Sequence, residues 1–262
     1  MRAFAFVSAI SLLLTGSLEA APRRVASLNL CTDELLLMLA EPRQIASVTY
    51  LSHLEAESLL WRQARRFRKN DGSLVSVVGL KPDLVLTMGG GGRDRMRIAA
   101  RLGIRTLDLP FPETLADVEW SIVQVADAIG RRPAAAPLLA RIAALKRNAP
   151  PRRIDTIWLG GGGRTLGASS LGGQWMALAG LRQRPLKGDE VSLEQLLVRP
   201  PTIILRSDYR SGQHSGEQRW LSHPLASANR RARTVLTDGR LWTCKGPSLT
   251  AEIERLRREV VR

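Results

Sequence analysis

Two runs of four glycines carry the clearest chemical signal in the sequence. Gly89 to Gly92 follow an apolar segment and precede Arg93, and Gly160 to Gly163 follow another and precede Arg164. Glycine lets a backbone approach a ligand closely, and successive amides form nests that bind anions. A single run is equally compatible with a tight turn. Two runs that each follow a strand favour a ligand site at the carboxyl ends of those strands.

Neither run matches a nucleotide-binding motif. Gly162 and Gly167 have the spacing of a phosphate loop, but Ala168 and Ser169 follow where lysine and then serine or threonine are required. The dinucleotide fingerprint also fails, because Thr165 stands in place of its third glycine. We therefore expect no cofactor.

Residue types suited to catalysis are present, but their spacing is weak evidence for an enzyme. Ser170 lies in a segment that resembles a nucleophile elbow without its first glycine. His53, His214 and His223 lie far apart and show no metal-ligand spacing. One alternative function is a secreted serine hydrolase that uses Ser170 with one of these histidines. We expect instead that the chain is not an enzyme and that its side chains form no metal site.

The net charge of +15 comes from 39 Lys and Arg against 24 Asp and Glu among 262 residues. The basic residues are spread over every expected element, without the tail or helical stripe typical of nucleic-acid binding. We therefore expect no nucleic-acid partner. A cationic surface-binding protein is a second alternative function. A sharper interpretation is a binding cleft that attracts anionic ligands.

Residues 1–21 have the pattern of a secretory signal peptide. Arg2 precedes an apolar run from Ala3 to Leu14, and small residues follow at Ala20 and Ala21. The run is too short to span a membrane as a helix. No cysteine stands near the expected cleavage site, so a lipid anchor is not indicated. We expect an exported protein whose mature chain starts near Ala21.

Strands and helices alternate through the first half of the mature chain, which favours parallel βαβ units. The expected strands are Arg24 to Leu28, Gln44 to Tyr50, Leu84 to Met88 and Ile104 to Leu109. The expected helices are Asp33 to Ala40 with Thr32 as its cap, Leu74 to Leu80, Arg93 to Leu102, and Thr114 to Ile129. The basic stretch from Arg62 to Lys69 is expected to be a loop.

The second half of the chain repeats the first in outline. Asp83 to Arg93 has an echo in Asp155 to Arg164. Val75 to Asp83 has an echo in Val191 to Pro201, and a strand from Thr202 to Arg206 follows. Two similar α/β lobes account for both echoes.

One stiff helix is expected between the halves. Pro133 to Asn148 is alanine-rich, has Leu138, Ile142 and Leu145 at helical spacing, and contains Pro137 where a first turn tolerates it. The expected fold is therefore α/β, with two Rossmann-like lobes joined by one long rigid helix and a ligand cleft between the lobes. The expected boundaries are residues 22–130 for the first lobe, 131–149 for the helix and 150–262 for the second lobe.

Several segments resemble one family of transport proteins. They are Arg24-Val-Ala-Ser-Leu28, Thr32-Asp-Glu-Leu-Leu36, Leu80-Lys-Pro-Asp-Leu-Val-Leu86, Leu102-Gly-Ile104 and Leu241-Trp-Thr-Cys-Lys-Gly-Pro247. Together with the connecting helix they look like the iron-siderophore and vitamin B12 class of periplasmic substrate-binding proteins, which is class III with a helical backbone. The resemblance covers about the whole mature chain.

That resemblance implies a function. Such proteins bind a metal chelate in the cleft between two α/β lobes and deliver it to an ABC permease in the inner membrane, without catalysis. We expect the chelate to be a ferric siderophore, with cobalamin or haem as the lesser alternatives. We also expect a periplasmic location and a monomer.

The family builds its cleft from segments that follow the carboxyl ends of strands, and the resemblance assigns ligand contacts on that basis. Aromatic faces and guanidinium groups suit a planar or anionic chelate. The expected ligand-binding residues are Asn29, Cys31, Tyr50, His53, Met88, Arg93, Trp158, Arg164, Arg206, Tyr209, Arg210, Trp242 and Cys244.

Members of the family also present one acidic residue on each lobe to the permease. The segment Val191-Ser-Leu-Glu-Gln-Leu196 matches the second-lobe motif and puts Glu194 in the acidic position. Ser192 and Gln195 form a capping context that places Glu194 in an exposed first helical turn. Asp94 is the expected acid of the first lobe.

The two cysteines, Cys31 and Cys244, follow strands of different lobes, so the expected fold makes them neighbours at the cleft. Export and an even number of cysteines favour a disulfide on general grounds. The alternatives are two unrelated buried thiols, or a thiol pair that contacts the ligand or a soft metal.

Overall fold

The computed structural model of the protein describes residues 21–90, 93–209, 215–227 and 229–260. Residues 1–20 of the expected signal peptide, Arg210 and His214 lie outside the described residues, as does the side chain of Arg93. Among the helices of the described ranges, none is long and apolar enough to cross a membrane.

The first lobe contains a parallel five-stranded sheet in the order β3-β2-β1-β4-β5. Its strands are β1 (Val25–Ser27), β2 (Ile45–Thr49), β3 (Arg68–Asn70), β4 (Leu84–Met88) and β5 (Arg105–Leu109). Its helices are α1 (Leu30–Leu39), α2 (Trp61–Ala64), α3 (Val75–Val78), α4 (Arg93–Arg101) and α5 (Leu115–Ala128). Every residue of β1 and β4 is buried, which is typical of a parallel sheet covered on both faces.

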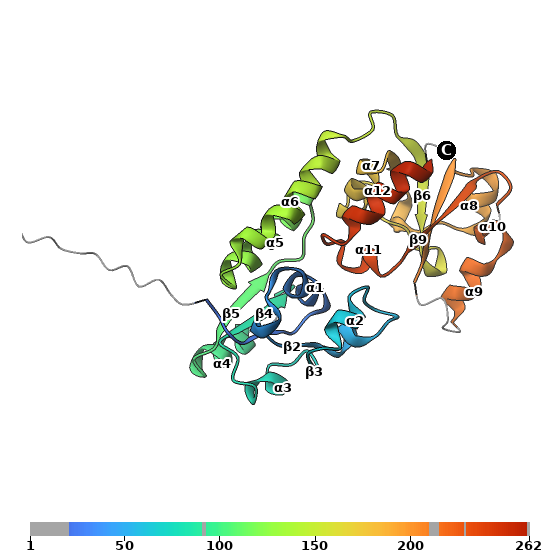
Figure 1. The fold of residues 1–262 in the computed structure, drawn as a ribbon. Coiled ribbons are helices and arrows are strands. Elements are labelled where there is room, and N and C mark those ends of the chain that lie inside the picture. Colours follow the sequence, from blue (N-terminus) through green and yellow to red (C-terminus); the bar gives the residue numbers. More distant parts are fainter. Residues whose placement is uncertain (1–20, 91–92, 210–214, 228, 261–262) are drawn as a thin grey trace, which may run out of the picture.

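The second lobe contains a parallel four-stranded sheet in the order β7-β6-β8-β9. Its strands are β6 (Ile154–Leu159), β7 (Leu181–Gln183), β8 (Ile203–Asp208) and β9 (Arg233–Asp238). Its helices are α7 (Leu171–Leu178), α8 (Leu193–Val198), α9 (Gly216–Ser222), α10 (Pro224–Ser227), α11 (Leu241–Cys244) and α12 (Leu249–Val260). Two α/β lobes with parallel sheets confirm the predicted fold (Figure 1).

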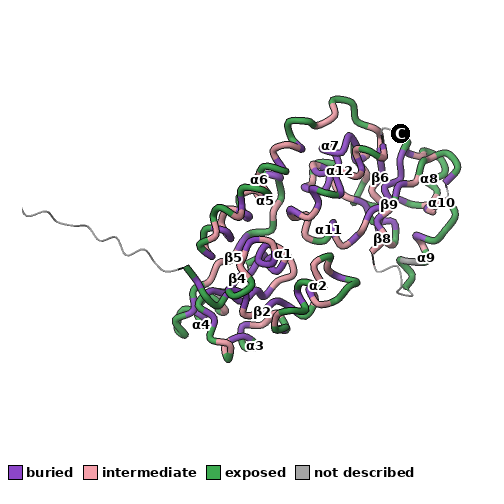
Figure 2. The backbone as a smooth tube through the Cα atoms, in the orientation of Figure 1, coloured by how far each residue is buried: buried purple, intermediate pink, exposed green. Residues whose placement is uncertain are grey.

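One helix, α6 (Arg132–Arg147), runs from the first lobe to the second, as predicted (Figure 1). It buries Ile142 and Leu145, two of the residues whose spacing predicted it. Pro133 lies in its first turn, whereas Pro137 lies inside the helix and not in the first turn where it was expected. The largest buried apolar cluster extends from β1 of the first lobe to α12 of the second. Figure 2 shows the buried positions concentrated in and around the two sheets.

The start of α1 differs from the prediction. Asn29, not Thr32, caps the helix, and its side-chain oxygen accepts a hydrogen bond of 2.8 Å from the amide of Cys31. The Thr32 hydroxyl is buried inside the helix, where it bonds the carbonyl of Asn29 and lies 2.7 Å from the hydroxyl of Ser27. Asparagine and threonine both cap helices well, so the local sequence did not discriminate between them.

The basic stretch from Arg62 to Lys69 is not wholly a loop, and that prediction was wrong. It contains α2 and most of β3, which pairs with β2 in the parallel register Ser47 to Arg68. Arg68 and Lys69 are exposed, so only the backbone of this edge strand joins the sheet at those positions. Because apolar and polar residues do not alternate in this segment, the sequence pattern did not predict a strand there.

A buried carboxyl group connects α1 to the carboxyl end of β2. Asp33 is fully buried, and its Oδ2 accepts hydrogen bonds from the Thr49 amide at 3.0 Å, the Thr49 hydroxyl at 2.5 Å and the Ser52 hydroxyl at 2.5 Å. These donors favour the ionised form, but burial outweighs them and raises the pKa of Asp33 to about 6. The folded state therefore holds this proton more tightly than the unfolded chain does.

We expect Asp33 to make folding stability depend on pH. Its pKa is about 6 when folded against 3.8 unperturbed, so its contribution to the unfolding free energy falls as pH rises from about 4 to about 6. The total decrease is up to about 3 kcal/mol. Urea denaturation of wild type and Asp33→Asn across this range measures the difference, because the variant keeps every other titrating group. A difference that does not change with pH would contradict the assignment.

Candidate functional site

The carboxyl ends of β6, β8 and β9 open onto a cavity of about 370 Å³. This is the edge at which parallel α/β sheets bind ligands. The residues that line the cavity are Trp158, Gly160, Gly161, Arg164, Ser207, Tyr209, Ser215, Glu217, Gly239, Trp242 and Thr243. We call this space the second-lobe cavity. Of the predicted ligand-binding residues, Trp158, Arg164, Tyr209 and Trp242 lie in it.

The second glycine run forms the wall of this cavity. A methyl group on Gly160 would lie 2.9 Å from the Trp158 ring, and one on Gly161 would lie 3.0 Å from Cβ of Glu217. Gly163 has φ of +81°, and a methyl group there would lie 2.4 Å from the carbonyl oxygen of Val191. Glycine is therefore required at these positions, because a side chain would collide with neighbouring residues or strain the turn. The first two glycines of the run also border the cavity.

The first glycine run lies at the end of β4 in the other lobe. Gly89 and Gly90 both have positive φ, at +86° and +75°. A methyl group on Gly89 would lie 2.2 Å from the ring of Phe111, so the tight turn lets that ring pack on the backbone. The last two glycines of the run lie outside the described residues.

Two tryptophans form an aromatic wall. The ring centroids of Trp158 and Trp242 are 5.9 Å apart with an angle of 57° between the ring planes. Trp242 is almost fully buried, and its indole N–H donates to the Thr237 hydroxyl at 2.9 Å. Trp242 therefore supports Trp158, which is the ring that remains partly exposed at the cavity.

Three buried polar atoms at this edge have no hydrogen-bond partner among the described residues. They are Nε1 of Trp158, Nε of Arg206 and Oδ1 of Asp208. Buried polar groups are nearly always paired, so an unpaired atom beside a cavity marks a place where a ligand or ordered water supplies the partner. Of these three residues only Trp158 lines the cavity, whereas Arg206 and Asp208 lie on β8 and do not line it.

The arginine-rich sequence suggested a positively charged cleft, but the cavity also contains an acidic side chain. The exposed guanidinium of Arg164 has its Nη2 3.6 Å from Oε1 of Glu217. Sequence reasoning missed Glu217, because it lies on α9 and not directly after a strand. Ser207 and Gly239 stand at or just after strand ends, so the rule that found Trp158 would have found them as well.

The predicted contacts of the first lobe do not line the second-lobe cavity. The Asn29 side chain is used as a helix cap, and Tyr50 is exposed where β2 ends. His53 is partly buried, and burial, followed by the nearby charges of Lys69 and Arg65, lowers its pKa. Met88 is only 8% exposed and packs in the core, so its prediction as a cleft residue is corrected.

The two cysteines form a disulfide that joins the lobes. Cys31 in α1 and Cys244 in α11 have Cα atoms 5.2 Å apart. Both sulfur atoms are used in the bond, so neither cysteine presents a thiolate to a ligand. Beside the bond, the Glu34 carboxylate accepts a hydrogen bond of 3.0 Å from the amide of Ser248. Burial at this contact raises the pKa of Glu34.

Two further polar contacts cross between the lobes next to the cavity. The Tyr209 hydroxyl donates to Oε2 of Glu57 at 2.5 Å. Nη1 of Arg240 donates to the carbonyl oxygen of Glu55 at 2.6 Å. Glu55 and Glu57 follow β2, whereas Tyr209 and Arg240 follow β8 and β9. The carboxyl ends of the two sheets therefore face each other.

The predicted docking acids are both exposed. Glu194 lies in the first turn of α8, with the predicted capping box between Ser192 and Gln195. Asp94 lies in the first turn of α4 and forms an ion pair of 2.7 Å with Arg97.

Ser170, the nucleophile of the hydrolase alternative, has a structural role. The Ser170 hydroxyl caps α7, accepting from the Gly173 amide at 3.3 Å and donating to the carbonyl of Gly167 at 2.7 Å. In the part of the chain that the structure describes, no three His, Cys, Asp or Glu side chains are grouped as they would be to hold a metal ion. The cavity has the features of a binding site.

Comparison with known proteins identifies the fold. No family model matches the sequence, and no curated protein matches it by sequence. Solved structures match over almost the whole chain. The haem-binding protein BhuT, bound to two haems, has a TM-score of 0.66 at 20% identity and covers 91% of this chain and 97% of its own. The chain has the two-lobe fold of periplasmic binding proteins.

Two further structures of this fold bind other metal chelates. The vitamin B12 binding protein BtuF of Vibrio cholerae has a TM-score of 0.64 at 18% identity, covering 91% of this chain and 96% of its own. The siderophore-binding protein BauB was solved with two molecules of acinetobactin and ferric iron. It has a TM-score of 0.68 at 15% identity, covering 92% of this chain and 93% of its own. The resemblance seen in the sequence is thus confirmed at the level of the fold.

We expect loss of the disulfide to destabilise the protein strongly. The bond joins residues 213 positions apart, and chain-entropy arguments give up to about 5 kcal/mol for so long a loop. Guanidinium denaturation of the Cys31→Ser/Cys244→Ser variant measures the loss. Dithiothreitol should lower the stability of wild type and leave that of the double variant unchanged. Two thiols that react in the unfolded, unreduced wild type would contradict the bond.

Proposed function

We propose that the protein is the periplasmic substrate-binding protein of an ABC importer, which captures a metal chelate and delivers it to an inner-membrane permease. The observation that carries the proposal is the second-lobe cavity at the carboxyl ends of a parallel sheet, with an arginine and a partly exposed tryptophan whose indole N–H has no partner among the described residues. Neighbours in fold bind haem, vitamin B12 and a ferric siderophore. Export through the signal peptide of residues 1–21, and a monomeric state, belong to the same proposal.

The ligand in this proposal is an anionic or planar chelate, with a ferric siderophore preferred to haem and cobalamin. The Trp158 ring provides a face for stacking, and its free N–H provides a donor. The charged guanidinium of Arg164 can form bidentate hydrogen bonds with carboxylate or catecholate oxygens. The Tyr50 and His53 turn of the first lobe contributes contacts from the opposite side of the cleft.

Native mass spectrometry of the protein from the periplasm of its own host tests the proposal. A bound, coloured chelate supports it and identifies the ligand class. In parallel, quenching of tryptophan fluorescence measures affinity for ferric siderophores, haem and cobalamin. Absence of binding across all three classes, with no bound mass in the native protein, would overturn the proposal.

We expect Arg164→Gln to weaken binding of an anionic chelate by about tenfold or more, because a charge-assisted hydrogen bond contributes about 1.5 to 3 kcal/mol. The loss of positive charge also leaves Glu217 facing the ligand without its partner. Arg152→Gln is the matched control, since Arg152 is exposed and remote from the cavity. Fluorescence titration at one ionic strength compares the two. Equal chelate affinities of the two variants would show that Arg164 does not contact the ligand.

Glu194 is proposed to contact the permease. We expect Glu194→Ala to reduce chelate uptake in cells several-fold and to leave chelate affinity unchanged, because the carboxylate is exposed and outside the cavity. Asp94→Ala should have a smaller effect, since Asp94 is already paired with Arg97. Glu254→Ala on α12 is the control. A loss of affinity in the purified Glu194 variant would assign the residue to the cleft instead.

A further inference from the structure

Arginines gather at the edge of the first sheet that lies opposite the cleft. Parallel strands all begin at the same edge, so the residues that precede β1, β2 and β3 come together there. They surround an open cavity of about 540 Å³, which we call the amino-edge pocket. Its charged residues are Arg23, Arg24, Arg43, Arg66 and Arg68.

The charges of this pocket are only partly balanced. Arg43 is paired with Glu41 at 2.6 Å, and Nε of Arg24 donates to the carbonyl of Leu80 at 2.8 Å. The side chains of Arg23, Arg66 and Arg68 have no carboxylate partner within the described ranges of the chain. The Asp83 carboxylate is nearby, but it accepts from the backbone amides of Arg23 and Arg24, at 2.7 and 3.1 Å.

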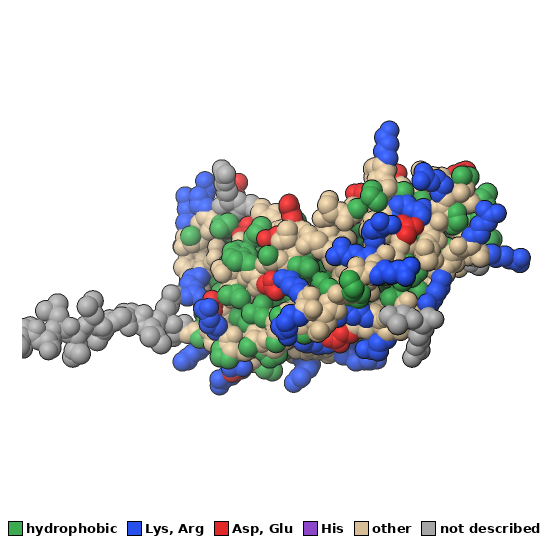
Figure 3. All heavy atoms as spheres, turned by 90° about the horizontal axis from the view of Figure 1, so that it is seen from above, with side chains coloured by type: hydrophobic (Ala, Val, Ile, Leu, Met, Phe, Trp, Pro, Cys, Tyr) green, Lys and Arg blue, Asp and Glu red, His purple; other side chains and the backbone are tan. Residues whose placement is uncertain are grey.

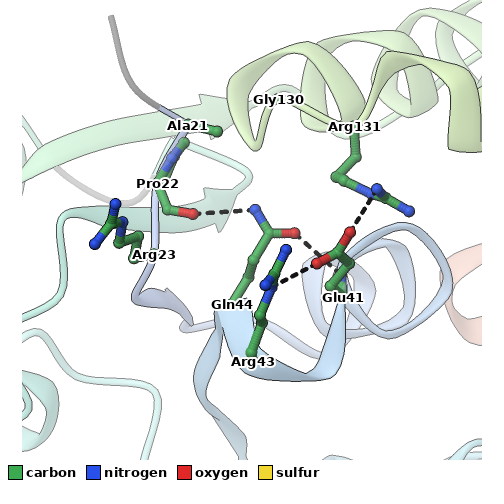
Figure 4. A pocket seen from close by; sticks show the side chains of 8 residues that line it. All are labelled: Ala21, Pro22, Arg23, Glu41, Arg43, Gln44, Gly130 and Arg131. Carbon is green, nitrogen blue, oxygen red and sulfur yellow. Dashed lines mark hydrogen bonds and ion pairs between the residues drawn. The ribbon is translucent and has the colours of Figure 1, made fainter.

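A neighbouring cavity of about 690 Å³ shows the contrast (Figure 4). There, Glu41 lies between Arg43 and Arg131 and binds each guanidinium at 2.6 Å. The segment before β1 is fixed at the same place, because the Gln44 side-chain amide donates to the carbonyl of Pro22 at 3.0 Å. Positive charge is thus neutralised on one side of Arg43 and left unpaired on the other.

The guanidiniums share the pocket with three apolar side chains. Ile45 is buried, and Phe67 and Leu80 are partly buried, whereas most of the accessible lining is polar. Elsewhere the basic residues are dispersed over both lobes, as Figure 3 shows for one face. Like charges held around one hollow repel each other, and an anion that bonds several of them relieves that repulsion.

We propose that the amino-edge pocket is a second binding site, separate from the cleft, for a phosphate-bearing anion. Guanidinium groups bond phosphate oxygens in pairs, which suits a tetrahedral group with several oxygens better than a single carboxylate. The phosphate belongs either to a small soluble molecule or to an anionic lipid headgroup.

Two binding assays with matched variants test the proposal. The test variant is Arg66→Gln/Arg68→Gln, which removes two unpaired guanidiniums. The control is Arg152→Gln/Arg153→Gln, which removes the same charge from an exposed pair outside the pocket. Calorimetry measures binding of pyrophosphate, and sedimentation measures binding to vesicles of phosphatidylglycerol or phosphatidylcholine. Thermal unfolding of each variant shows that it is folded.

We expect wild type to bind pyrophosphate or phosphatidylglycerol vesicles, and the test variant to bind at least about tenfold more weakly than the control. Binding of free pyrophosphate indicates a soluble phosphate compound, and binding to phosphatidylglycerol vesicles alone indicates a lipid headgroup. Rising salt should weaken either interaction, because the groups are exposed. Equal losses in the test and control variants would reduce the effect to net charge and overturn the proposal. Absence of binding to both probes would also overturn it.

Discussion

The lobes are tied together at several places, and the geometry of the cleft depends most on three of these ties. The helix α6 joins them once through the chain, and the disulfide joins α1 to α11 a second time. The third tie is non-covalent, since the Gln174 side chain in α7 bonds the backbone of both Glu113 and Leu115 at the start of α5. Two lobes joined by a single linker move freely as rigid bodies. Lobes joined at three points keep only the rotations that leave all three intact.

This constraint determines how the cleft works in the proposed function. The Tyr209–Glu57 and Arg240–Glu55 contacts lie beside the second-lobe cavity and cross from one lobe to the other. They are hydrogen bonds at partly exposed positions, so they break and re-form at much smaller energetic cost than the disulfide. A ligand that enters between the lobes therefore exchanges these polar contacts for its own, whereas the covalent ties preserve the alignment of the two sheets.

The distribution of charge follows from the same parallel architecture. At the carboxyl edge of the second sheet, the positive Arg164 is offset by Glu217, and buried polar groups there have unmet hydrogen-bonding capacity. At the amino edge of the first sheet, five arginines near three strand starts line one pocket, and only Arg43 has a carboxylate partner among the described residues. Part of the high net charge of the chain therefore lies away from the cleft, at the opposite edge of the first lobe.

The sequence by itself determined the two-lobe α/β architecture, the connecting helix and most strands, because alternating apolar segments and capping residues act over short stretches of chain. The placement of Trp158 and Arg164 near a strand end was predicted in the same way, and both line the second-lobe cavity. Only the tertiary structure decided that Cys31 bonds Cys244, that Glu217 faces Arg164 and that Met88 is buried in the core. It also decided that Arg68 belongs to an edge strand, where the backbone pairs with the next strand and the side chain adds nothing to an apolar pattern in the sequence. Each of these outcomes depends on which distant residue lies opposite in space, and local propensity contains no information about that.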